Sequence, residues 1–190
     1  MPNSAGFDAG PALQRLQPFQ RRTVDHVFRR FFLDSDQCRR FLVADEVGLG
    51  KTMVARGVIA KTLERLWPTV PRIDVVYICS NQAIAEQNVK KLNITAAANV
   101  ARATRLTMLA TQLGGKHGLD ANRINFISLT PGTTLNLAYA TGQAGERALL
   151  LRLLDGVVEP YNGVRKLLQV DVGLDNWRAW EAAIWEETVS

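Results

Sequence analysis

The sequence predicts an α/β fold in which a mainly parallel sheet is covered by helices. Three segments at residues 41–43, 72–80 and 124–129 are expected to be strands: 41–43 is an apolar run, and 72–80 is β-branched and apolar, as in a buried parallel strand. Each is followed by a short turn that leads into an expected helix, and strands that alternate with helices in this way pair in parallel. We therefore expect three strand–turn–helix units in succession.

The helices are predicted from apolar residues that recur three and four positions apart. The expected ranges are 18–32, 52–67, 82–92, 145–154, 161–170 and a last helix from 175. Pro18 suits the first turn of its helix, whereas Pro68 ends the second because proline cannot continue a helix. A further short strand is expected at 105–109. The alanine-rich segment 93–104 is compatible with a helix or with an irregular connection.

Composition points to a globular protein with the cytoplasm as its expected location. The chain has 190 residues, of which 47% are hydrophobic and 22% are charged, enough for one well-buried domain. No apolar run approaches the ~18 residues that span a bilayer, so no membrane partner is expected. The N-terminus lacks the charged and apolar regions of a signal peptide. Cys38 and Cys79 lie far apart, which predicts neither a disulfide framework nor a metal site.

Positive charge is concentrated in the first two-thirds of the chain. The formal net charge of +5 is the balance of +8 over residues 1–123 and −3 over residues 124–190. A basic surface suits a polyanionic partner, because neutralising phosphates releases counterions. The alternative is a solvated basic surface, and composition does not choose between the two.

The segment from Asp45 to Thr52 has the chemistry of a phosphate-binding loop. Gly48 and Gly50 allow backbone N–H groups to approach an anion closely, and the N-terminus of the helix that follows adds a favourable field. Lys51 can reach the outer phosphates of a nucleotide, and the Thr52 hydroxyl can ligate Mg²⁺. The alternative is a glycine-rich turn ahead of a surface helix.

This loop resembles motif I of superfamily 2 helicases and translocases, especially the Swi/Snf-type DNA translocases, and also their DEAD/DEAH-like relatives. The residues that carry the resemblance are Asp45, Glu46, Val47, Gly48, Leu49, Gly50, Lys51 and Thr52. Asp45 stands where the general G-x-x-x-x-G-K-[ST] pattern has its first glycine. The resemblance implies ATP and Mg²⁺ as cofactors and nucleic acid, DNA more than RNA, as partner.

The resemblance covers roughly residues 13–135 and implies part of a helicase ATP-binding lobe. The implied fold is a P-loop NTPase (RecA-like) three-layer sandwich with a mainly parallel sheet, incomplete in this chain. Residues 1–12, rich in Pro, Gly, Asn and Ser, are expected to be a flexible leader. Residues 136–190 are expected to be a helical insertion or extension.

Other segments match the positions of further family motifs. Gln20 resembles the glutamine upstream of motif I that reads adenine, and its amide donor and acceptor match the edge of that base. The positions implied to contact the nucleic-acid backbone are Ser80, Asn81 and Gln82 in motif Ia, and Thr130, Gly132 and Thr133 in motif Ib. The alternatives are a capping helix around Gln20, polar helix caps at 80–82 and a proline–glycine turn at 130–133.

Motif II, an Asp-Glu pair at the end of a strand, is not found after Glu46. Its aspartate would hold Mg²⁺ and its glutamate would orient the attacking water. The one candidate is Asp171, if 166–172 forms a strand, and the competing interpretation is a helix-to-loop transition. The sequence therefore predicts the ATP-binding part of an ATP-dependent helicase or translocase that hydrolyses ATP poorly by itself and lacks the second RecA-like lobe. The alternative is a non-catalytic truncated fragment, either an interaction module or a product without independent function.

Overall fold

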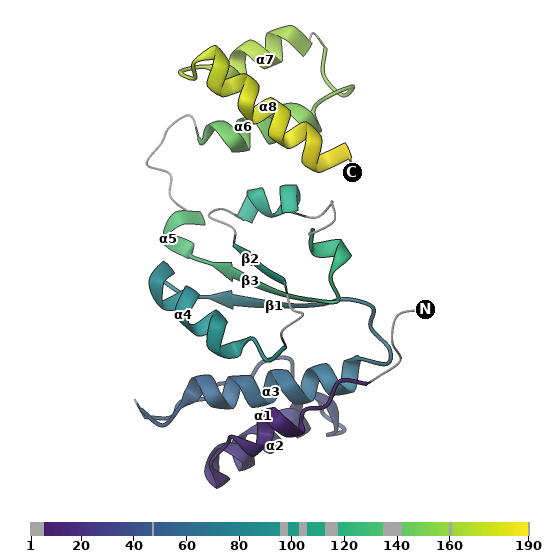
Figure 1. Ribbon diagram of the computed structural model, residues 1–190, viewed down its shortest axis with the longest axis vertical. Coiled ribbons are helices and arrows are strands. Elements are labelled where there is room, and N and C mark those ends of the chain that lie inside the picture. Colours follow the sequence, from purple (N-terminus) through teal and green to yellow (C-terminus); the bar gives the residue numbers. More distant parts are fainter. Residues whose placement is uncertain are drawn as a thin grey trace. The chain divides into compact units, whose positions relative to one another are not determined.

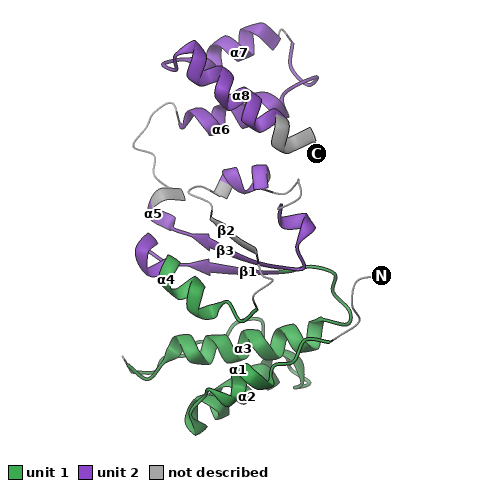
Figure 2. Ribbon diagram, in the orientation of Figure 1, with its two compact units in different colours: residues 1–73, 86–98 green, residues 74–85, 99–190 purple. Residues whose placement is uncertain are grey.

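The protein is a mixed α/β chain that divides into two compact units (Figure 1). In the computed structural model the described residues are 6–46, 48–95, 99–102, 106–112, 118–134, 142–159 and 161–189. Unit 1 comprises residues 1–73 and 86–98, and unit 2 comprises residues 74–85 and 99–190, as Figure 2 shows. The domain boundary expected at residue 135 falls outside the described residues.

Unit 1 is built from helices. Its elements are α1 (Gly10–Gln14), α2 (Pro18–Phe32), α3 (Lys51–Leu66) and the greater part of α4 (Gln82–Leu92). The helices predicted from Pro18 onward and after the glycine-rich loop are confirmed. Both end near the predicted positions, and α3 stops directly before the proline-containing turn at 67–69.

Gly57 lets α2 and α3 approach closely. A Cβ atom at this position would lie 2.7 Å from Val24 Cγ2 and 2.8 Å from Leu16 Cδ1. Leu16, Val24 and Val54 are buried together at this contact. The glycine is therefore required by packing, because any side chain would occupy space that the neighbouring helix already fills.

Composition predicts a loose leader at 1–12, whereas the structure packs residues 7–12 against the helices of unit 1. The Phe7 ring lies 5.6 Å from the Trp67 ring, measured between centroids. Ala9 is fully buried, and its N–H donates to Glu64 Oε1 at 3.0 Å. Gly10 and Pro11 of this segment thus begin a short helix, α1, that packs against α3 through small buried residues.

Unit 2 contains a three-stranded sheet in the order β1-β3-β2, formed by β1 (Ile73–Ile78), β2 (Asn99–Arg102) and β3 (Ile124–Leu129). Strands β2 and β3 pair in parallel, with Asn99 opposite Asn125, and the arrows of β1 and β3 in Figure 1 point the same way. The parallel sheet is thus confirmed in its coarse form. β1 is predicted to be buried, but as an edge strand it leaves Val76 50% and Ile78 64% exposed.

Two predicted strands are wrong. Residues 41–43 are irregular and Leu42 is 83% exposed, because no strand in the described part of the chain offers a hydrogen-bonded neighbour. Residues 106–109 of the predicted strand at 105–109 belong to the 3₁₀-helix η1 (Leu106–Gln112), where the Thr111 hydroxyl donates to Met108 O at 2.8 Å. The strand β2 instead lies in the alanine-rich segment, because pairing with β3 decides its conformation.

The C-terminal helices are confirmed as α6 (Ala144–Leu153), α7 (Tyr161–Gln169) and α8 (Leu174–Val189). Their common core consists of Ala148, Leu149, Leu151, Trp177 and Ile184. Arg165 Nε and Nη2 donate to the two Glu181 carboxylate oxygens, each at 2.6 Å, and this bidentate pair joins α7 to α8. Among the described residues, no helix combines the length and apolar character needed to cross a membrane.

Candidate phosphate-binding loop

The loop at residues 45–50 owes its shape to two glycines. Gly48 has φ +91° and Gly50 has φ +79°, a backbone conformation that residues other than glycine rarely adopt. Gly50 is the N-cap residue of α3, and its carbonyl accepts the Met53 N–H at 2.7 Å. The glycine pattern noted in the sequence therefore meets a real backbone requirement, and the turn ends directly at the N-terminus of a 16-residue helix.

Lys51 lies within hydrogen-bonding distance of the loop backbone. Its Nζ donates to Asp45 O at 2.7 Å and to Glu46 O at 3.0 Å. The side chain is exposed, so an incoming phosphate oxygen would compete with these two carbonyls for the ammonium group. The backbone N–H groups of Lys51 and Thr52, the first two residues of α3, have no carbonyl of the helix to donate to.

Gln20, the predicted adenine reader, is bound to the protein itself. Its Oε1 accepts the Gln17 N–H at 3.0 Å, and its Nε2 donates to Leu49 O at 3.0 Å. The side chain is 7% exposed, and a Cβ on Gly50 would lie 2.5 Å from its Nε2. In this structure Gln20 therefore fastens the N-terminus of α2 to the glycine-rich loop, a positioning role that the sequence interpretation missed. The Gln-x-x-Gln spacing, which resembles a capping box, indicates only the contact with Gln17.

The remaining loop residues offer a limited set of metal ligands. Thr52 is half-buried in the first turn of α3, Asp45 is half-buried, and Glu46 is exposed. Val47 lies outside the described residues. Within the described ranges no three His, Cys, Asp or Glu side chains gather where they would hold a metal ion. A Mg²⁺ ion at Thr52 would therefore take its other ligands from phosphate oxygens and water, as this ion commonly does.

The predicted motif Ia segment lies where β1 ends and α4 begins. Asn81 Oδ1 accepts the Ile84 N–H at 3.1 Å, so Asn81 caps α4. Ser80, Asn81 and Gln82 are all exposed. The predicted helix cap is confirmed, and the same side chains face solvent at the edge of the sheet.

The predicted motif Ib segment lies at the same edge of the sheet. Thr130 follows β3 and precedes α5 (Pro131–Thr134), and the Cys79 N–H at the end of β1 donates to Leu129 O at 3.1 Å. The structure therefore brings residues 80–82 and 130–132 together. Thr130 is 8% exposed, while a Cβ on Gly132 would meet nothing within 4 Å. The Thr133 side chain lies outside the described part of the chain.

Asp171 is not at the end of a strand. The segment 161–169 is helix α7, and Asp171 follows it with φ +64°. The Val172 N–H donates to Gln169 O at 2.9 Å, which closes the turn. Aspartate is one of the few residues that tolerate this left-handed conformation at a helix end. The predicted strand at 166–172 is therefore wrong, and Asp171 ends a helix as the competing interpretation stated.

Comparison of the chain with protein-family models, with curated proteins and with solved structures found no match.

Proposed function

We propose that residues 45–52 bind the triphosphate of ATP together with Mg²⁺, with Thr52 as the protein's ligand to the metal. In this proposal the chain is part of a RecA-like ATP-binding lobe of an ATP-dependent helicase or translocase that acts on nucleic acid, DNA more than RNA. One observation carries the proposal. Two left-handed glycines lead into a 16-residue helix, and Lys51 Nζ lies 2.7 and 3.0 Å from loop carbonyls. Free N–H groups, a helix N-terminus and an ammonium group are the donors that a triphosphate needs.

The same residues do not supply efficient hydrolysis. An attacking water must be oriented by a carboxylate or amide, and the metal is held by a second carboxylate in this class of site. Asp171, the one candidate, ends α7. We therefore expect binding without efficient turnover by this chain alone, with the second RecA-like lobe coming from the full-length protein or from a separate chain.

Titration of the chain with a fluorescent ATP analogue and Mg²⁺ tests the proposal. The wild type is expected to bind saturably, and Lys51→Ala to weaken binding roughly ten- to hundredfold through loss of a charged hydrogen bond to phosphate. Lys90→Ala removes the same charge from an exposed site near the end of α4 and is expected to bind like the wild type. Undiminished binding by Lys51→Ala would exclude the loop as the phosphate site.

The alternative, a non-catalytic interaction module, is favoured by one feature of α6. Leu150 and Leu153 on α6 are 44% and 64% exposed, and Val157 in the turn that follows the helix is 73% exposed. A folded wild type that binds no ATP would support this function. Nucleic-acid-stimulated ATP turnover that is lost in Lys51→Ala would exclude it.

A further inference from the structure

The outer side of α2 carries basic side chains that are not part of the nucleotide loop. Arg22, His26 and Arg29 are exposed and follow one another at spacings of four and three residues, so they lie on one face of the helix. Together with Asp25 they line an open hollow of about 290 Å³. The negative charge of Asp25 is balanced by Lys61, whose Nζ lies 2.7 Å from Asp25 Oδ1.

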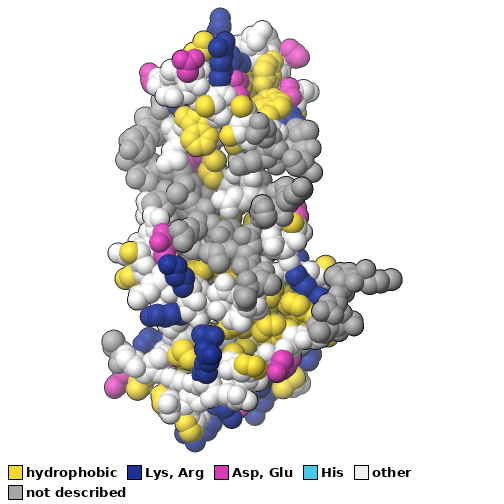
Figure 3. Space-filling view, viewed as in Figure 1, with side chains coloured by type: hydrophobic (Ala, Val, Ile, Leu, Met, Phe, Trp, Pro, Cys, Tyr) yellow, Lys and Arg dark blue, Asp and Glu magenta, His cyan; other side chains and the backbone are white. Residues whose placement is uncertain are grey.

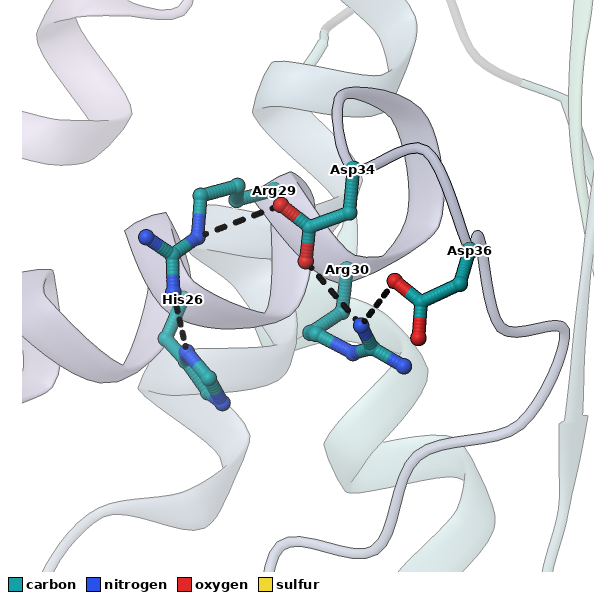
Figure 4. A network of polar contacts seen from close by, with 5 residues as sticks. All are labelled: His26, Arg29, Arg30, Asp34 and Asp36. Atoms are coloured by element: carbon teal, nitrogen blue, oxygen red, sulfur yellow. Dashed lines mark hydrogen bonds and ion pairs between the residues drawn. The ribbon is translucent and has the colours of Figure 1, made fainter.

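Nearby arginines differ in whether their charge is already balanced. Figure 4 shows Arg30 between two carboxylates, with Nη1 at 3.1 Å from Asp34 and at 3.0 Å from Asp36. These contacts hold the pKa of Asp36 below its ordinary value. Arg29 shares Asp34 with Arg30, because its Nε lies 3.5 Å from Asp34 Oδ1. By contrast, Arg22, Arg39 and Arg40 make no hydrogen bond or ion pair with any described residue. Arg30 is thus structural, whereas three guanidinium groups are left for a partner.

An aromatic ring places the segment 39–41 beside this face. The Phe41 ring lies 5.4 Å from the His26 ring at an interplanar angle of 75°, and 6.4 Å from the Phe31 ring. Phe41 remains 38% exposed. Guanidinium groups beside an exposed ring are the combination that binds single-stranded nucleic acid, through phosphate contacts and base stacking.

The surrounding unit is basic as a whole. Unit 1 contains fourteen Lys and Arg against eight Asp and Glu, whereas unit 2 contains nine against ten. On the face of unit 1 that Figure 3 shows, dark blue side chains are more frequent than magenta ones. The local field therefore favours a polyanion at unit 1.

We propose that the α2 arginine face, formed by Arg22, His26, Arg29, Arg39, Arg40 and Phe41, binds the phosphate backbone of a single-stranded nucleic acid. Forked guanidinium groups match phosphate geometry, and Phe41 offers its ring to a base. This surface consists of residues other than those of the nucleotide loop and of segments 80–82 and 130–133. The proposal for this surface and the proposal for the nucleotide loop can therefore be refuted independently.

Fluorescence anisotropy of a fluorescein-labelled 20-nucleotide oligo(dT) tests the surface. The variant is Arg22→Gln/Arg40→Gln, because both side chains are exposed and neither makes a hydrogen bond or ion pair with a described residue, so the fold should persist. Binding is expected to weaken about tenfold, and the slope of log K against log salt to shrink by about 1.4, roughly 0.7 for each lost phosphate contact. Phe41→Ala is expected to weaken binding without changing that slope.

Lys166→Gln/Arg178→Gln, which removes two charges from exposed sites on α7 and α8, is the matched control and should keep the wild-type affinity and slope. Equal losses in the two double variants, or no loss in the first, would overturn the proposal. So would a wild type that binds phosphatidylserine vesicles but not the oligonucleotide, or that binds neither. Lys51→Ala should lose ATP and keep the oligonucleotide, which separates this surface from the nucleotide loop.

Discussion

Gln20→Ala tests whether the Gln20 side chain stabilises the loop or serves only to recognise the adenine base. The substitution removes the bond from Gln20 Nε2 to Leu49 O and the bond from the Gln17 N–H to Gln20 Oε1. Each hydrogen bond contributes on the order of 1 kcal/mol, and the second also serves the N-terminus of α2. Because the side chain is 7% exposed, water replaces it poorly. We therefore expect a loss of about 2 kcal/mol in the free energy of unfolding, or about 4–8 °C in Tm.

Thermal unfolding followed by circular dichroism, without nucleotide, measures this loss. Gln87→Ala changes the same residue type at an exposed site of α4 and should leave Tm within about 2 °C of the wild type. Gln20→Glu keeps an acceptor for the Gln17 N–H but sets a carboxylate oxygen against Leu49 O, so it should also destabilise. A Tm unchanged by Gln20→Ala, with ATP affinity reduced, would refute the positioning role and favour adenine reading.

Two further changes test the packing within each unit. Gly57→Leu is expected to lower the free energy of unfolding by about 2 kcal/mol in thermal denaturation, because a Cβ there already lies 2.7 Å from Val24 Cγ2. Glu181→Gln is expected to cost about 1 kcal/mol at pH 7 in urea denaturation, since it breaks the bidentate pair with Arg165. Arg165 holds the pKa of Glu181 below its ordinary value of 4.5, so this stabilisation is complete well above pH 4.5 and is lost as the pH falls through the lowered pKa.

Matched controls make both results interpretable. Ala55→Leu introduces the same side chain at an exposed site of α3 and should change stability little. Equal losses at positions 55 and 57 would contradict the close helix contact at Gly57. If the difference in the free energy of unfolding between the wild type and Glu181→Gln stayed constant from pH 7 to pH 3, it would contradict a contribution from the charged pair.

The elements predicted well are those with a local cause. The helix at 82–92 and the strand at 124–129 have the bounds expected from periodicity, β-branched residues and turns. The elements predicted wrongly depend on distant partners. Residues 41–43 have the composition of a strand but no neighbour in the described part of the chain, whereas 99–102 lack that composition and pair with β3.

The candidate site divides in the same way. The positive φ angles of Gly48 and Gly50 follow from residue type and could be anticipated, as could the helix cap by Asn81. The contact from Gln20 to Leu49 joins residues 29 positions apart, and only the packing of α2 against α3 brings them together. Sequence patterns thus locate the loop, while tertiary packing decides what holds it.

The loop is consequently held by helices in this structure. Residues 41–46, which precede the loop, are irregular and pair with no strand in the described part of the chain. What fixes it is Gly50 as the N-cap of α3 and Gln20 bound to Leu49 O from α2. Because Gly57 sets the approach of α2 to α3, the position of Gln20 depends on that helix contact. The geometry of the phosphate loop therefore depends on the helix packing of unit 1. Gly57, although it lies within α3 and outside the loop, affects both the position of the loop and the stability of the unit.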